Sequence, residues 1–134
     1  MVTVQNRRKE SILVVDDSED NLYLMQLILE IQGYRVYIAN NGQDALKSSV
    51  EYHPNLILLD VMMPQMDGYE VINQLRQNIS LSSIPVYLVT ADKYISRGEA
   101  IAAGADGLIY KPIEIDELLS QVELTLGTSV EQQN

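Results

Sequence analysis

The sequence has no cysteine, no tryptophan and no phenylalanine, and basic residues are scarce. Without cysteine the chain forms no disulfide bond and has no thiolate chemistry, which is compatible with a reducing compartment. Nine lysine and arginine residues are outnumbered by 19 aspartate and glutamate residues, giving a formal net charge of −10. Such a charge repels phosphate backbones and anionic membrane surfaces. Direct nucleic-acid binding is therefore not expected, because the one basic cluster, Arg7–Lys9, is too small to support it.

Long hydrophobic runs are also missing. No apolar run approaches the roughly 20 residues that a membrane-spanning helix needs, and the first residues lack the apolar core of a secretory signal. We expect a cytoplasmic protein without membrane insertion. The 134 residues suffice for one domain. We expect it to occupy residues 11–127, after a flexible segment over 1–10 and before a polar tail over 128–134, with no output domain following.

Two kinds of segment alternate along the chain. Five short apolar runs are separated by longer stretches with helical spacing. The runs are Ile12–Val15, Val36–Ala39, Leu56–Leu59, Val86–Val89 and Leu108–Tyr110. Runs that are apolar on both faces suit strands of a parallel sheet covered by helices. Five such strands with intervening helices predict right-handed crossovers and a three-layer α/β fold.

Glycine and proline support this division. Gly33 and Gly104 follow two helical stretches, the second of which is predicted over Asp92–Ala103, and both glycines suit the end of a helix. Pro54 and Pro85 precede apolar runs, where a missing N–H does little harm. The boundaries of the predicted elements are therefore consistent along the chain.

Acidic residues follow two of the predicted strands. Asp16 and Asp17 come directly after the first apolar run, and Asp60 follows the third. Because the carboxyl ends of parallel strands open onto one edge of the sheet, three carboxylates are expected to meet there. A lone Asp at such a place is usually a helix cap, but three acids without a His or Cys partner favour a hard cation, Mg²⁺ before Zn²⁺.

A hydroxyl and an ammonium group join the same edge. Thr90 follows the fourth run and Lys111 follows the fifth. A carboxylate nucleophile, a divalent cation, a hydroxyl donor and a fixed positive charge are together what transfer of a phosphoryl group requires. The pattern therefore predicts a phosphoryl-accepting site.

The chain resembles the receiver domain of bacterial two-component response regulators, of the CheY-like kind, over about residues 11–126. The motifs that carry the resemblance are Val14-Val15-Asp16-Asp17, Leu58-Leu59-Asp60-Val61-Met62-Met63-Pro64, Met66-Asp67-Gly68, Thr90-Ala91, Ala103-Gly104-Ala105-Asp106 and Lys111-Pro112. They occur in the order and spacing of that family. The resemblance implies a doubly wound, flavodoxin-like parallel sheet with strand order 2-1-3-4-5.

The resemblance also implies roles for individual residues. Asp60 is expected to accept a phosphoryl group from a phosphohistidine of a sensor histidine kinase or a phosphotransfer protein. Asp16 and Asp17 are expected to hold Mg²⁺ together with Asp60 and the backbone carbonyl of Met62.

Thr90 and Lys111 are expected to contact the bound phosphoryl group, and Lys111-Pro112 is expected to have a cis peptide bond. Phosphorylation then draws Thr90 toward the site and biases a two-state element. The usual aromatic switch position, three residues before the lysine, is Leu108 here, and Tyr110 lies on the same sheet face. We expect a muted switch, or one in which Leu108 packing replaces ring rotation.

The first helix is expected over Ser18–Gln32. Its inward stripe is predicted as Asn21, Leu24, Met25, Ile28 and Ile31. Other apolar residues, Leu22, Tyr23 and Leu27, fall outside that stripe and suggest a docking patch for the kinase helical bundle. A helix buried more deeply by its neighbours is the alternative.

Three other functions compete with this interpretation. A phosphatase of the haloacid-dehalogenase type carries a second Asp two residues after the nucleophile, whereas that position is Met62 here. In a flavodoxin-type flavin carrier, the acids at 16–20 would repel the flavin phosphate. A degenerate receiver that only binds partners remains open, although all five site residues are present. We expect a signalling domain that catalyses only its own phosphotransfer and dephosphorylation and acts on an effector protein that the sequence does not identify.

Overall fold

The five apolar runs form one parallel sheet in a computed structural model, which describes residues 10–127. The strands are β1 (Ser11–Val15), β2 (Arg35–Ala39), β3 (Leu56–Asp60), β4 (Val86–Thr90) and β5 (Gly107–Tyr110). Their order in the sheet is β2-β1-β3-β4-β5, and every neighbouring pair is parallel. The predicted strand order and doubly wound α/β fold are confirmed.

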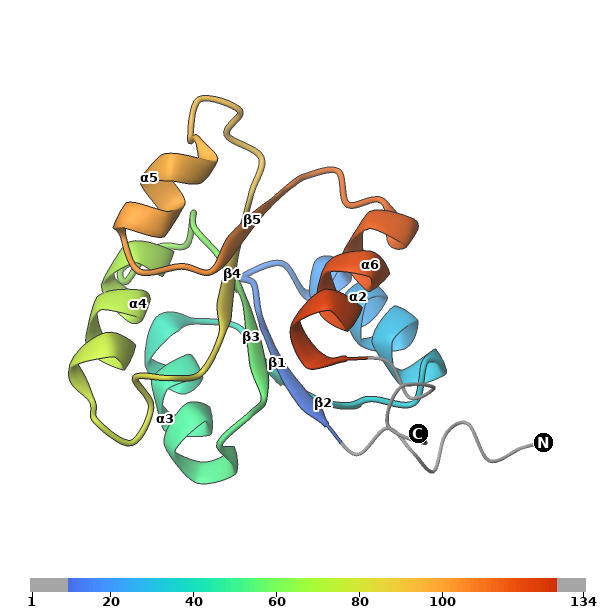
Figure 1. Ribbon diagram of the computed structural model, residues 1–134, viewed down its shortest axis with the longest axis horizontal. Helices are drawn as coiled ribbons and strands as arrows, with labels where there is room; N and C mark the ends of the chain where they lie inside the picture. The colour runs from blue at the N-terminus through green and yellow to red at the C-terminus, as the bar shows by residue number, and fades with distance from the viewer. Residues whose placement is uncertain (1–9, 128–134) are drawn as a thin grey trace.

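Within residues 10–127, five helices cover both faces of the sheet; four of them connect successive strands, and the last follows β5. They are α2 (Glu19–Ile31), α3 (Gly42–Tyr52), α4 (Gly68–Gln77), α5 (Arg97–Ala102) and α6 (Ile115–Leu126). Figure 1 shows α2 and α6 on one side of the sheet and α3, α4 and α5 on the other. Over residues 10–127, no helix has the length and apolar character required to cross a membrane. The predicted N-terminal segment, apart from Glu10, and the predicted polar tail lie outside the described residues.

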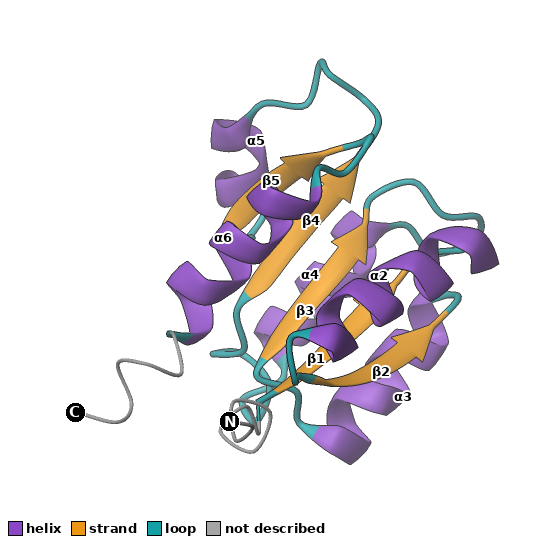
Figure 2. Cartoon of the chain, turned by 90° about the vertical axis from the view of Figure 1, so that its right-hand side faces the viewer, coloured by secondary structure: helices purple, strands orange, loops and turns teal. Residues whose placement is uncertain are grey.

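The strands contribute to two separate hydrophobic cores because successive side chains point to opposite faces. On β1, Leu13 and Val15 belong to the core that also contains residues of α3, α4 and α5. Ile12 and Val14 belong to the core that contains residues of α2 and α6. The three central strands, β1, β3 and β4, are buried along their whole length, and their parallel pairing places their carboxyl ends together. Figure 2 shows the strand arrows running in the same direction.

Helix α2 buries a different face from the predicted one. Leu22, Met25 and Leu29 are its buried residues, whereas Leu24 is 50% exposed and Ile31 is 65% exposed. Apolar residues lie almost all around this helix, so several three-and-four-residue stripes fit its sequence and periodicity alone cannot select among them. The predicted stripe was wrong except for Met25 and, in part, for the half-buried Asn21 and Ile28.

The helical stretch predicted from Asp92 begins five residues late. Helix α5 starts at Arg97, where Ser96 caps it by accepting a hydrogen bond from the Glu99 N–H. Before it, the Asp92 side chain accepts a hydrogen bond from the N–H of Tyr94, a local turn that competes with helix formation. Residues 91–96 therefore form a loop at the edge of the sheet that carries the site.

The opposite edge of the sheet is tied together by Arg76. Its guanidinium donates to the carbonyl oxygens of Ile84 at 2.7 Å and Gly104 at 2.9 Å, and it pairs with Asp106 at 3.1 Å. The same Asp106 oxygen accepts a hydrogen bond from the N–H of Val86 at 2.9 Å. Arg76 thus connects the end of α4, the start of β4 and the turn between α5 and β5.

Candidate functional site

The three predicted carboxylates meet at the carboxyl edge of the sheet. Asp16 directly follows β1 and Asp60 is the last residue of β3, which pairs with β1. Oxygen atoms of Asp16, Asp17 and Asp60 all lie within 4.8 Å of one another. Asp16 and Asp60 are buried, whereas Asp17 is exposed. Oxygen ligands of this kind suit a hard divalent cation, so the donor set fits a metal ion.

Lys111 provides the positive charge at this site. Its ammonium group lies 3.0 Å from Oδ2 of Asp16 and 3.4 Å from Oδ2 of Asp60, so it bridges β1 and β3 from the end of β5. Burial alone lowers the pKa of Lys111, but the hydrogen bond to Asp16 and the charge of Asp60 outweigh that effect and raise it. The side chain therefore remains a cation and offsets the repulsion between the two buried acids.

Asp60 is a perturbed acid. Burial, followed by the charge of Asp16, raises its pKa from 3.8 to about 6, although Lys111 and the N–H of Met62 act in the opposite direction. The Met62 N–H donates to Oδ1 of Asp60 at 3.3 Å. Burial and the charge of Asp16 thus disfavour the ionised form of Asp60, and a bound cation would stabilise that form.

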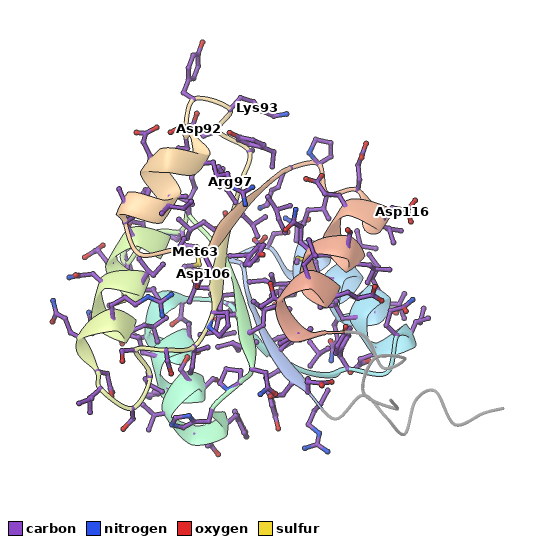
Figure 3. All side chains as sticks on the ribbon, viewed as in Figure 1. Met63, Asp92, Lys93, Arg97, Asp106 and Asp116 are labelled. Carbon is purple, nitrogen blue, oxygen red and sulfur yellow. The ribbon has the colours of Figure 1, made fainter. Side chains whose placement is uncertain are left out.

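Thr90 ends β4 beside this cluster and is fully buried. Its hydroxyl oxygen accepts a hydrogen bond from the N–H of Asp92 at 3.0 Å. Figure 3 shows Asp92 and Lys93 on the loop that leads into α5. The hydroxyl is therefore engaged by the 91–96 loop, and a movement of Thr90 would be transmitted to that loop.

Asp16 is held by two residues that follow it. The N–H of Ser18 donates to Oδ1 of Asp16 at 2.9 Å, and the side-chain amide of Asn21 donates to Oδ2 at 3.2 Å. Asn21 was not predicted as a site residue, because it was assigned to the apolar face of α2. The available signal was its position in the first turn of a helix that starts directly behind the acid pair.

The proposed switch position and its neighbour lie on the same face of the sheet. Leu108 is 7% exposed and packs in the core on the α3, α4 and α5 side, and Tyr110 packs against the same core. The hydroxyl of Tyr110 donates to the carbonyl oxygen of Ile95 at 2.6 Å. The ammonium of Lys93 lies 5.6 Å from the centre of the Tyr110 ring.

The predicted docking residues divide between two environments. Tyr23 is 68% exposed and Leu27 is 44% exposed, so both are available to a partner. Leu22 is 4% exposed and packs in the core between α2 and the sheet, so its prediction as a docking residue was wrong. It occupies the stripe that faces the sheet, as described above for α2.

A groove runs from this helix to the segment after β5. Apolar residues line most of it: Leu24, Ile28, Ile113 and Ile115. Asn21 and Lys111 also line the groove. An apolar groove thus reaches the two side chains that bind Asp16.

The comparisons with known proteins agree with this geometry. Residues 12–123 match the response regulator receiver domain family. The alkaline phosphatase synthesis transcriptional regulatory protein PhoP of Bacillus subtilis is 40% identical over 121 residues, which are 90% of this chain and 50% of that protein. The chain spans about half the length of the curated relatives it matches.

Solved structures of receiver domains have the same fold. The chemotaxis protein CheY4 of Vibrio cholerae has a TM-score of 0.81 and 28% sequence identity, covering 87% of this chain and 98% of that one. The signal receiver domain of a signal transduction histidine kinase from Syntrophus aciditrophicus has a TM-score of 0.79 and 35% identity, covering 87% and 89%. Because the family model matches residues 12–123 and a solved receiver domain is 35% identical over most of its length, the chain belongs to the response regulator receiver domain family, whose members are phosphoacceptors in two-component signalling.

Proposed function

We propose that this chain accepts a phosphoryl group on Asp60, in a reaction that requires Mg²⁺, and signals through a phosphorylation-dependent protein interaction. The observation that carries the proposal is the placement of Asp60. Its buried carboxylate lies 3.4 Å from the ammonium of Lys111, and one oxygen each of Asp16, Asp17 and Asp60 lie within 4.8 Å of one another, where they could share one metal ion. Because response regulators generally work in the cytoplasm, the proposal includes that location.

The residues divide the reaction between them. A carboxylate oxygen of Asp60 attacks the phosphorus of a phosphohistidine; the new O–P bond forms as the N–P bond breaks, and the imidazole nitrogen leaves with a proton from solvent. In this proposal Lys111 pairs with the phosphoryl oxygens, and Thr90 donates its hydroxyl to them. Bound Mg²⁺, held by Asp16, Asp17, Asp60 and the carbonyl of Met62, supplies charge neutralisation on those oxygens.

To signal, phosphorylation also has to change a surface that a partner protein binds. Thr90 moves toward the phosphoryl group and pulls on the 91–96 loop through the N–H of Asp92, while Leu108 repacks in the space behind it. Met62 and Asp92 flank the entry for an attacking water, so hydrolysis of the aspartyl phosphate by the domain itself is part of the proposal. The downstream partner is an effector protein.

The central test is chemical labelling. The chain is incubated with acetyl phosphate and MgCl₂, and its intact mass is measured before and after Asp60→Asn. We expect the mass of one phosphoryl group on the native chain, none on the variant and none without Mg²⁺. Labelling that survives Asp60→Asn would contradict Asp60 as the acceptor.

The site of kinase docking is tested separately. A Tyr23→Ser, Leu27→Ser double variant removes two exposed apolar side chains of α2. We expect slower transfer from a purified phosphohistidine-containing phosphotransfer domain and unchanged labelling by acetyl phosphate. Leu124→Ser, at a position on α6 that is 77% exposed, is the control and should change neither rate. Equal slowing of both reactions by the double variant would contradict the docking role.

A further inference from the structure

Both oxygens of the Asp16 carboxylate are hydrogen-bonded. Oδ1 accepts from the N–H of Ser18 at 2.9 Å. Oδ2 accepts from two side chains, the ammonium of Lys111 at 3.0 Å and the amide of Asn21 at 3.2 Å. Asp16 is only 2% exposed, so each of these donors stands in for water that burial has removed.

The two side-chain donors on Oδ2 differ in whether they also bind another acceptor of the site. Lys111 is shared with Asp60, whose Oδ2 lies 3.4 Å from the same ammonium, and the proposed reaction uses that ammonium on the phosphoryl group. Asn21 lies in the first turn of α2, where its own N–H is bonded to the capping hydroxyl of Ser18 at 3.3 Å. When Lys111 turns to the phosphoryl group, Asn21 remains next to Asp16.

We infer that Asn21 is a positioning residue that keeps the Asp16 carboxylate oriented toward the metal ion after Lys111 has moved to the phosphoryl group. The inference rests on the proposed function. A neutral amide suits this task because it donates a hydrogen bond without adding charge. A lysine would compete with the metal ion, and an aspartate would add a fourth acid beside Asp16, Asp17 and Asp60.

The effect of Asn21 should depend on Lys111. While both donors are present, Lys111 still orients Asp16, and removal of Asn21 weakens Mg²⁺ binding only modestly. Without Lys111, Asn21 is the remaining side-chain donor on Oδ2, and its removal should cost more. Partners that orient a metal ligand typically contribute 10-fold to 100-fold in affinity, so we expect about a threefold loss in the first case and at least about tenfold in the second.

The test is a two-by-two set of chains titrated with MgCl₂ by calorimetry: native, Asn21→Ala, Lys111→Met and the double variant. Non-additive losses, larger for Asn21→Ala in the Lys111→Met background, are the expected result. A residue with a purely structural role would lower the unfolding temperature without this dependence on Lys111. Asn21→Leu, which keeps the bulk of the side chain and removes the donor, should behave like Asn21→Ala.

Gln26 supplies the matched control on the same helix. Its side-chain amide donates to the carboxylate of Glu30, also at 3.2 Å, away from the acids. Gln26→Ala should leave Mg²⁺ affinity unchanged. Equal Mg²⁺ affinity for the native chain and for both Asn21 variants, in both backgrounds, would overturn the inference while leaving the proposed function intact. If the native chain binds no Mg²⁺ and takes no label from acetyl phosphate, the proposed function itself fails, and the inference falls with it.

Discussion

The hydroxyl of Tyr110 donates a hydrogen bond of 2.6 Å to the carbonyl oxygen of Ile95. This contact joins the end of β5, one residue before Lys111, to the 91–96 loop, which also holds the N–H that binds Thr90. Thr90 and Lys111, which are proposed to contact the phosphoryl group, are therefore linked through the 91–96 loop and the phenol of Tyr110. Since Leu108 stands at the usual aromatic switch position, Tyr110 is the aromatic side chain of β5 that touches this loop.

Tyr110→Phe should loosen the loop without disturbing the core. The ring keeps its apolar contacts, and the lost hydrogen bond contributes about 1 kcal/mol. We expect faster amide hydrogen exchange in residues 91–96 and little change in β4. Tyr94→Phe, at a side chain that is 94% exposed, is the control and should exchange like the native chain. Unchanged exchange in the Tyr110 variant would show that the loop is held by other contacts.

Gly68 lies against the end of the strand that carries the phosphoacceptor. A Cβ at this position would lie 2.7 Å from the carbonyl oxygen of Asp60 and 2.9 Å from the Cα of Val61, and backbone atoms cannot move away as a flexible side chain would. Gly68→Ala should therefore displace Asp60, with a loss of about 1–3 kcal/mol in unfolding free energy and at least a tenfold loss in labelling by acetyl phosphate. Denaturant unfolding and intact-mass labelling measure the two effects.

Gly98 is the control for that substitution. It is the second residue of α5, and the nearest contact of an added Cβ is the Ser96 Oγ at 3.8 Å. Gly98→Ala should stabilise the chain by up to about 1 kcal/mol, because alanine favours the helix, and leave labelling unchanged. Equal labelling defects in both variants would mean that the contact with Asp60 is not the cause.

The raised pKa of Asp60 makes its contribution to stability fall as pH rises. In the unfolded chain the group titrates near 3.8, and in the metal-free fold near 6. Its favourable contribution is complete below pH 3.8 and is lost as pH rises through about 6. We therefore expect Asp60→Asn to stabilise the metal-free chain at pH 7 by about 1–3 kcal/mol, and progressively less toward pH 4. Urea unfolding in EDTA at several pH values measures this difference.

Adding MgCl₂ should reduce that difference at pH 7. The ion binds the native chain more tightly than the variant and stabilises the fold it binds. Below pH 6 protons compete for Asp60, and the effect of Mg²⁺ should weaken. A pH-independent difference between the two chains would contradict a raised Asp60 pKa.

Arg76 should contribute more to stability than its surface position suggests. It donates to the backbone carbonyls of Ile84 and Gly104 and pairs with Asp106. Arg76→Ala leaves these partly buried acceptors without their donor, so we expect a loss of about 2–3 kcal/mol in urea unfolding. Arg97→Ala, at an exposed position in α5, should remain within about 0.5 kcal/mol of the native chain. A similar small effect for Arg76 would show that water replaces its hydrogen bonds.

The sequence predicts the strands and their chemistry better than the orientation of the helices. Each apolar run became a strand within one residue at either end, because short runs of branched apolar residues bounded by polar residues, glycine or proline favour strands. Asp16, Asp17, Asp60 and Lys111 were brought together because they follow parallel strands. Helix α2 is apolar on several sides, so periodicity left its buried face undetermined until neighbouring packing selected Leu22.

Hydrogen bonds made by individual side chains could not be predicted from the sequence, for a different reason. The amide of Asn21 and the hydroxyl of Tyr110 act through single hydrogen bonds whose partners depend on the angle at which a helix or loop meets the sheet. Composition and spacing do not encode that angle. The late start of α5 has a local cause, since the caps at Asp92 and Ser96 overrode a stretch with helical spacing.

Helix α5 is attached unequally at its two ends. After its last turn, the Gly104 carbonyl and Asp106 are both bound by Arg76. Before its first turn, the 91–96 loop is bound to β5 through the Tyr110 hydroxyl. A displacement of this helix would therefore be a tilt about its carboxyl end, with the greatest travel at Ser96 and Arg97, so a probe attached at Arg97 would register the change more sensitively than one at Ala102.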